Sequence, residues 1–261
     1  MRKVFSIFTL ALLMLGITSC DSSNDIPKFT AELLNNSVNL SQGASEKVSS
    51  SSATIEWDVS NTTLSLSYSV PLNGSSVANV NLSNAKLTAD NERNCYTFTA
   101  ASVGSGITDL TGYFNPTTGC MHIEFMAGGY YVSSNADLVF PYCTITTTNT
   151  EVEGATPTEN KDAVVLIKVN PSNMDALVIM YGIPLGGSSG TIQQVYFNGV
   201  KATATGNGYH LTLSEDLRST DASYVLNSLD ANVSANGLVI NGNFVLDNRY
   251  NGTITGTQFA K

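Results

Sequence analysis

Charged residues are scarce in this chain, and basic ones are the scarcest. Only 13% of the 261 residues are charged, and 12 Lys plus Arg against 21 Asp plus Glu give a formal net charge of −9. An acidic surface repels phosphate backbones and anionic lipid headgroups. We therefore expect no nucleic-acid partner.

The residue types that build metal and catalytic sites are also few. His122 and His210 are far apart in the sequence, and the four cysteines are too widely spaced to suggest a set of four zinc ligands. The sequence has no Gly-x-Ser-x-Gly elbow and no phosphate-binding glycine loop with a lysine. His122 and Glu124 share one face of an expected strand, but their alternation with Ile123 and Phe125 is typical of a plain surface strand. We expect no enzyme activity, no metal and no cofactor.

Beyond its N-terminus the sequence lacks any long hydrophobic run. Val4 to Leu15 follows two basic residues and is too short to span a bilayer as a mature helix, which is typical of a secretory signal. The stretch "ITSC", which ends at Cys20, resembles the lipobox of bacterial lipoproteins. This resemblance implies that residues 1–19 are removed and that Cys20 is acylated, with each buried methylene adding about 0.8 kcal/mol of membrane affinity. The alternative is an ordinary signal peptide cleaved elsewhere, with Cys20 a plain thiol.

The residues after Cys20 are polar, and we expect residues 20–52 to be the lipidated cysteine and a flexible tether, within which "FTAELLNNSVNL" can form a short strand or a helical turn. The first of them, "DSSND", resembles the acidic export signal of Bacteroidetes lipoproteins that reach the outer face of the outer membrane. A solvated tether predicts the same composition. We expect a protein anchored to the outer membrane by its lipid, facing either the cell surface or the periplasm.

The rest of the chain divides into two bodies of ordinary domain size. A second polar stretch, residues 144–162, contains Gly and Pro and predicts a linker. It separates a first domain at 53–143 from a second domain at 163–261.

Both bodies alternate apolar and polar residues with a period of two, which is typical of half-buried strands. The apolar residues of one such strand are Leu64, Leu66, Tyr68, Val70 and Leu72, and those of its counterpart are Leu177, Ile179, Tyr181, Ile183 and Leu185. A constant offset aligns "YSVPLNGSS" with "YGIPLGGSS". The segments "ATIEWDVS", "VNLSNAKLTA" and "YTFTA" then match "AVVLIKVN", "VYFNGVKATA" and "YHLTL" in the same order. This recurrence predicts an internal duplication.

No segment has a convincing helical pattern, and Gly, Asn and Ser interrupt short strands throughout. We predict an all-β fold with two similar antiparallel domains in tandem, each a barrel or a sandwich. Two halves of one barrel or sandwich are the alternative. Strand units such as "GLVINGNFVLDNRYNGTITGTQFA" behind a lipobox look like Bacteroidetes lipoproteins with calycin-like or similar β-domains. That resemblance implies an envelope location and supplies no functional residue.

Three cysteines remain if Cys20 is acylated, so at most one intramolecular disulfide can form. If "CMHIEFMA" pairs antiparallel with "ADLVFPYC" around the loop "GGYYVSSN", Cys120 comes opposite Cys143 and the two can form a bridge. A tighter turn would shift the register and leave buried thiols.

Tyrosines at expected turns are the candidate binding residues. Tyr130 and Tyr131 follow two glycines at an expected hairpin tip, and Tyr113 lies at another expected turn. Rings at such positions can stack on sugars or contact a protein, although a ring can also pack on its own domain. The alternation around Trp57 favours core packing for that ring.

Two functions from different classes follow. The first is a non-catalytic binding module of the cell envelope for glycans or another ligand, which predicts a concavity lined by rings. The second is a structural or adhesive lipoprotein that contacts other envelope proteins, which predicts self-association and no small-ligand pocket.

Overall fold

The protein is built of antiparallel strands in two compact units. The computed structural model describes residues 28–41, 46–72, 76–93, 95–115, 120–136, 138–186, 190–205, 208–234 and 239–258. The chain divides into unit 1, Met1–Asp137, and unit 2, Leu138–Lys261, and each is a β-domain. The predicted all-β fold with two similar domains is confirmed. Among the described residues no helix is long and apolar enough to cross a membrane, and the predicted signal peptide and Cys20 lie outside them.

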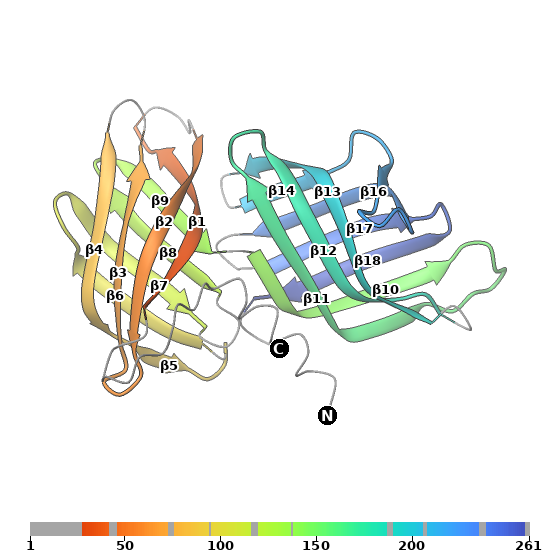
Figure 1. Ribbon diagram of the computed structural model, residues 1–261, viewed down its shortest axis with the longest axis horizontal. Helices are drawn as coiled ribbons and strands as arrows, with labels where there is room; N and C mark the ends of the chain where they lie inside the picture. Colours follow the sequence, from red (N-terminus) through yellow and green to blue (C-terminus); the bar gives the residue numbers. More distant parts are fainter. Residues whose placement is uncertain are drawn as a thin grey trace. The chain divides into compact units, whose positions relative to one another are not determined.

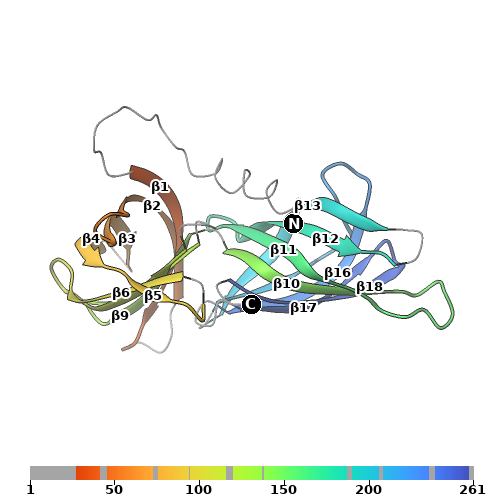
Figure 2. The same ribbon diagram turned by 90° about the horizontal axis from the view of Figure 1, so that it is seen from below.

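Unit 1 is a nearly closed meander (Figure 1). Its strands are β1 (Lys28–Asn39), β2 (Glu46–Asp58), β3 (Thr63–Pro71), β4 (Val77–Lys86), β5 (Thr88–Asp90), β6 (Cys95–Ser102), β7 (Ile107–Phe114), β8 (Met121–Ala127) and β9 (Tyr130–Ala136). They hydrogen-bond in the order β4-β3-β2-β1-β9-β8-β7-β6-β5. Only Leu87 separates β4 from β5, so one bent segment pairs first with β3 and then with β6. Figure 2 shows β1 to β4 on one side of the interior and β6 and β9 on the other.

Unit 2 is a closed barrel with the same meander. Its strands are β10 (Leu138–Asn149), β11 (Thr158–Asn170), β12 (Asp175–Pro184), β13 (Thr191–Thr205), β14 (Gly208–Thr212), β15 (Leu217–Arg218), β16 (Val225–Ser234), β17 (Val239–Leu246) and β18 (Tyr250–Thr257). The barrel closes because β10 pairs with both β11 and β18, and β14 pairs with both β13 and β16. The short β15 pairs with β16 alone.

The strand pairing repeats from one unit to the other. The segments matched in the sequence fall on β2, β3, β4 and β6 of unit 1 and on β11, β12, β13 and β14 of unit 2. At the bend of the fourth strand, Ala89 pairs with Tyr96 in unit 1 as Ala204 pairs with Tyr209 in unit 2. The two units are therefore two versions of one meander.

The predicted domain boundaries are wrong. Residues 20–52, expected to form a tether, supply β1 and half of β2, and residues 144–162, expected to form a linker, supply parts of β10 and β11. The units divide after residue 137 rather than after 143. The sequence of the second half of β10 is as polar as that of a linker, because every second residue is a threonine on the outer face of the barrel. Ile145, between Thr144 and Thr146, is fully buried.

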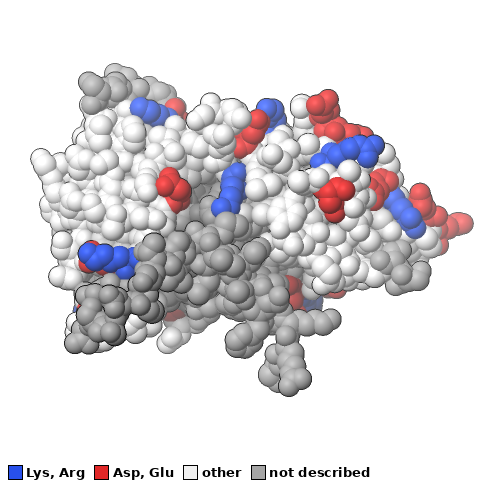
Figure 3. Space-filling model, in the orientation of Figure 1, with Lys and Arg blue, Asp and Glu red and all other residues white. Residues whose placement is uncertain are grey.

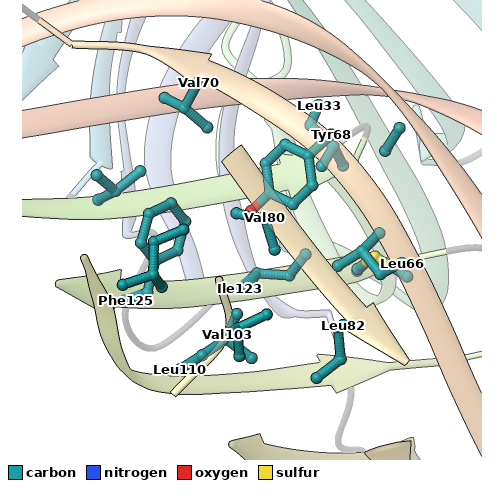
Figure 4. Close-up of a cluster of buried hydrophobic side chains, with 14 of the residues drawn as sticks. Leu33, Leu66, Tyr68, Val70, Val80, Leu82, Val103, Leu110, Ile123 and Phe125 are labelled. Carbon is teal, nitrogen blue, oxygen red and sulfur yellow. The ribbon is translucent and has the colours of Figure 1, made fainter. Parts of the chain in front are cut away.

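The apolar face predicted for β3 forms part of the core of unit 1. All five of its predicted core residues are buried: Leu64, Leu66, Tyr68, Val70 and Leu72. Figure 4 shows three of them together with side chains from β1, β4, β7 and β8. Burial of each such aliphatic side chain contributes about 1.5–3 kcal/mol. Trp57 packs against this core as predicted, with its ring 5.6 Å from the ring of Phe114.

The corresponding prediction for β12 is wrong in its first half. The inward residues there are Ala176, Val178 and Met180; of the odd-numbered set, Ile179 is also buried, but Leu177 and Tyr181 are only half-buried. Tyr181 lies on the outer face, where its hydroxyl accepts a hydrogen bond from Gln194 Nε2 at 3.0 Å. The alternation slips at Gly182, whose φ of 76° lies in the left-handed region that favours glycine.

Candidate functional site

The tyrosine pair predicted at a hairpin tip lies in a strand. Gly128 and Gly129 have positive φ angles of 55° and 86°, so they form the turn between β8 and β9 by themselves. Tyr130, the first residue of β9, packs against the core of unit 1 and accepts a hydrogen bond from Asn39 Nδ2 at 3.2 Å. The prediction of two rings at a loop tip is therefore wrong, because two glycines suffice for this turn.

Tyr131 belongs to a polar cluster on the outer face of β8 and β9. His122 Nε2 lies 2.9 Å from Glu124 Oε1, and His122 Nδ1 lies 2.7 Å from Asn135 Oδ1. The hydrogen bond with His122 holds the pKa of Glu124 below its usual value, and a hydrogen bond with Tyr131 lowers it further. Burial raises the pKa of Tyr131, so its hydroxyl stays protonated and donates a hydrogen bond to Glu124. We call these four residues, with Tyr113 and Arg93, the His122 cluster.

Tyr113, predicted at a turn, lies in β7 and completes the cluster. Its ring stacks on His122 with centroids 6.0 Å apart, and the guanidinium of Arg93 lies 4.7 Å from the ring centre. His122 is only 1% exposed. All three predicted ligand-binding tyrosines are thus half-buried and engaged by other side chains of unit 1, and His122 is enclosed. Among the described residues no group of three or more His, Cys, Asp or Glu could hold a metal ion.

The predicted bridge between Cys120 and Cys143 is wrong. Both are buried thiols without a disulfide, and they belong to different units. The bridge assumed that β8 pairs with the segment ending at Cys143, but β8 pairs with β9 instead. Burial raises the pKa of Cys143 to about 12, so this thiol stays protonated and unreactive at neutral pH.

Sequence reasoning missed a depression on the outer face of unit 2. Its volume is about 480 Å³, and it is open to solvent rather than enclosed. Its lining is Thr146, Thr148, Pro157, Ser228, Asn243, Phe244, Val245, Asn251, Gly252 and Thr253. We call it the threonine groove.

Strand register brings the groove residues together from distant parts of the chain. Thr253 of β18 pairs with Thr146 of β10 on one side and with Asn243 of β17 on the other. Asn251, two residues earlier on the same face, pairs with Thr148 and with Val245. Because side chains alternate along a strand, these polar groups face outward while the residues between them face the interior.

A glycine holds the floor of the groove. Gly252 pairs with Phe244, whose ring is buried inside the barrel. A Cβ at position 252 would lie 2.1 Å from Phe244 Cζ. Only glycine at position 252 therefore lets the ring of Phe244 pack against the inner face of β18. Gly252 lies in the strand between Asn251 and Thr253, whose side chains face outward.

The polar side chains that line the groove are uncharged hydrogen-bonding groups. None of its lining side chains is ionisable, and its threonine, serine and asparagine groups can both donate and accept. Val245 and Pro157 add apolar surface. The nearest charges along the sheet are two carboxylates: Asp230, which pairs with Asn243 and lies 3.0 Å from His210 Nε2, and Glu159, which pairs with Thr146. Such a lining can bind a polar molecule but presents no acid, base or activated nucleophile.

Charge is sparse elsewhere on the surface as well. On the face shown in Figure 3, Lys, Arg, Asp and Glu are scattered among neutral residues. The signal that could have found the groove was the recurrence of threonine at every second residue in "TITTT" and "TITGT". These segments are far apart in the chain, and only the closure of the barrel makes them neighbours.

Comparison with known proteins assigns no family. No protein-family model matches the sequence, and no curated protein matches it. A functional assignment therefore depends on the site itself.

Proposed function

We propose that this protein is a lipid-anchored, non-catalytic binding module of the bacterial outer membrane, and that its threonine groove binds a glycan. The observation that carries the proposal is the neutral lining of the groove, in which hydroxyl and amide groups from β10, β16, β17 and β18 converge on one depression.

A glycan matches this lining better than a charged or purely apolar ligand. Sugar hydroxyls donate and accept hydrogen bonds, as do Thr146, Thr253 and Asn243, so each buried group can find a partner. The C–H faces of a sugar ring can rest on Val245 and Pro157, which line the same depression. An ionised ligand would lose its hydration without gaining an ion pair.

The proposed location follows from the N-terminal sequence. Cys20 at the end of "ITSC" would carry the acyl chains, and the residues between it and β1 at Lys28 would hold unit 1 close to the membrane. A module with this anchor would face either the cell surface or the periplasm.

A glycan array tests the proposed function. The mature chain carrying Cys20→Ser, which prevents acylation, is compared with the same chain carrying Asn243→Ala in the groove. Asn241→Ala is the matched control, because Asn241 lies on the same exposed face of β17 outside the groove. We expect binding that Asn243→Ala weakens and Asn241→Ala leaves unchanged. A folded chain that binds no glycan but self-associates or co-purifies with envelope proteins would instead favour the structural or adhesive function.

A further inference from the structure

The threonine groove crosses the strands instead of running along one of them. Its lining comes from β10, β18, β17 and β16, which are consecutive neighbours in the sheet of unit 2. One row of the lining is Thr146, Thr253 and Asn243, and the second row is Thr148, Asn251, Val245 and Ser228. Within each row, every residue is the strand-pairing partner of the next.

The spacing of the strands gives each row a regular repeat. Neighbouring strands lie about 4.8 Å apart, so the four strands span about 14 Å from the first to the last. This repeat is comparable to the length of one sugar residue in an extended chain. Each strand therefore offers a hydroxyl or amide group at about the interval at which a linear glycan presents its own hydroxyls.

We propose, on the basis of the proposed function, that the ligand is a linear, neutral oligosaccharide that lies across β10, β18, β17 and β16, with about one sugar residue over each strand. Thr146, Thr253 and Asn243 bond one edge of the chain, and Thr148 and Asn251 bond the other. Val245 and the floor at Gly252 lie beneath the chain. The uncharged lining selects chains without carboxylate or sulfate groups.

An extended peptide is the less suitable occupant. Peptides that lie on sheets commonly add a strand to a free edge and bind through main-chain hydrogen bonds. Each of the four groove strands already has a hydrogen-bonded strand on both sides. The recognition groups left to a ligand are thus side chains, which suit a polyhydroxylated chain.

Isothermal titration calorimetry with neutral linear oligosaccharides of increasing length tests this inference. The series comes from the glycan that binds best on the array and is titrated into the mature Cys20→Ser chain. We expect affinity to rise with length up to about four residues, the number of strands crossed, and then to level off.

Two valine variants locate the ligand. Thr253→Val removes one groove hydroxyl with little change in volume, and we expect it to weaken binding roughly threefold to tenfold, the effect of one lost hydrogen bond. Thr255→Val is the control, because Thr255 is exposed on the same face of β18 but lies outside the groove. Asn251→Ala repeats the test on the second row, and thermal melts verify that each variant is folded.

The outcomes separate this inference from the function on which it rests. Full affinity for a single sugar, preference for a charged chain, or equal losses in Thr253→Val and Thr255→Val would overturn the transverse linear ligand while leaving a glycan-binding module in place. No binding to any glycan would overturn the proposed function itself.

Discussion

Glu124 is held as a carboxylate by its neighbours on the outer face of unit 1. Its Oε1 lies 2.9 Å from His122 Nε2, and Tyr131 also donates a hydrogen bond to it. The alternation of this pair with Ile123 and Phe125 predicts a plain surface strand, but His122 is only 1% exposed in the structure. Each partner is engaged by side chains of unit 1, so we expect the pair to stabilise the meander.

Replacing Glu124 with Gln should lower the stability of unit 1 by an amount that depends on pH. Because the folded pKa of Glu124 is lowered from its ordinary 4.5, its contribution is present above about that pH and is lost as the pH falls through the folded value. We expect a loss of about 1–2 kcal/mol at pH 7 and a smaller loss at pH 3.5. Urea unfolding followed by Trp57, the single tryptophan and a residue of unit 1, measures it. Equal losses at both pH values would contradict this role.

Gly252 is the residue on which the floor of the threonine groove depends. Gly252→Ala would place a Cβ against the buried ring of Phe244, and we expect it to lower the stability of unit 2 by about 1–3 kcal/mol, the usual cost of overpacking. Differential scanning calorimetry measures the change. A second variant with Phe244→Leu added should recover part of the loss, and no recovery would show that the strain lies elsewhere.

At the scale of the strand, the sequence predicts those strands that alternate strongly and misses those that do not. β3 was found because five apolar residues alternate with hydroxyls. The second half of β10 and all of β1 read as a linker and a tether in the sequence because a barrel strand needs an apolar residue only on its inner face. Thr, Ser and Asn on the outer face lower the mean hydropathy of the strand to that of a loop.

The candidate site was harder to predict than the fold. The groove depends on register between β10 and β18, which are more than 100 residues apart, and no local pattern specifies that pairing. The Gly-Gly pair before Tyr130 and Tyr131 predicts a loop tip that includes the tyrosines, whereas the two glycines, with positive φ, complete the turn and β9 begins at Tyr130.

Ile145 tests whether β10 is a barrel strand or a linker. It is fully buried in unit 2, so Ile145→Ala should cost about 2–5 kcal/mol of unfolding free energy. Thr146→Ala, one residue away on the outer face, should change stability by less than about 0.5 kcal/mol. Calorimetric unfolding of both variants provides the comparison. Equal, negligible effects would mean that this segment is a linker after all.

At the scale of the whole chain, the two similar meanders differ on their matching faces. Counted from the matched strands β2 and β11, the strands β1, β9, β8 and β7 of unit 1 follow one another in the sheet as β10, β18, β17 and β16 do in unit 2. Unit 1 carries the His122 cluster on this face, with aromatic and ionisable side chains engaged by one another. Unit 2 carries the threonine groove, with neutral groups open to a ligand. We therefore expect unit 2 to bind the ligand, and the His122 cluster of unit 1 to contribute to stability rather than to binding.

The proposed anchor can be tested on the complete chain. In a Gram-negative host, the full-length protein should fractionate with membranes and incorporate labelled palmitate, because acylation at Cys20 supplies two or more chains. Cys20→Ser should move the protein to the soluble fraction and abolish labelling. Cys95→Ser, which removes a buried thiol of β6, should leave both unchanged. Membrane association that survives Cys20→Ser would contradict a lipid anchor.

An NMR titration locates the binding site on the protein. The isotope-labelled mature Cys20→Ser chain is titrated with the best glycan from the array while backbone amide shifts are recorded. We predict shifts concentrated in β10, β16, β17 and β18 of unit 2. Shifts concentrated instead around Tyr113, Tyr130 and Tyr131 of unit 1 would contradict the threonine groove and return the site to the tyrosines.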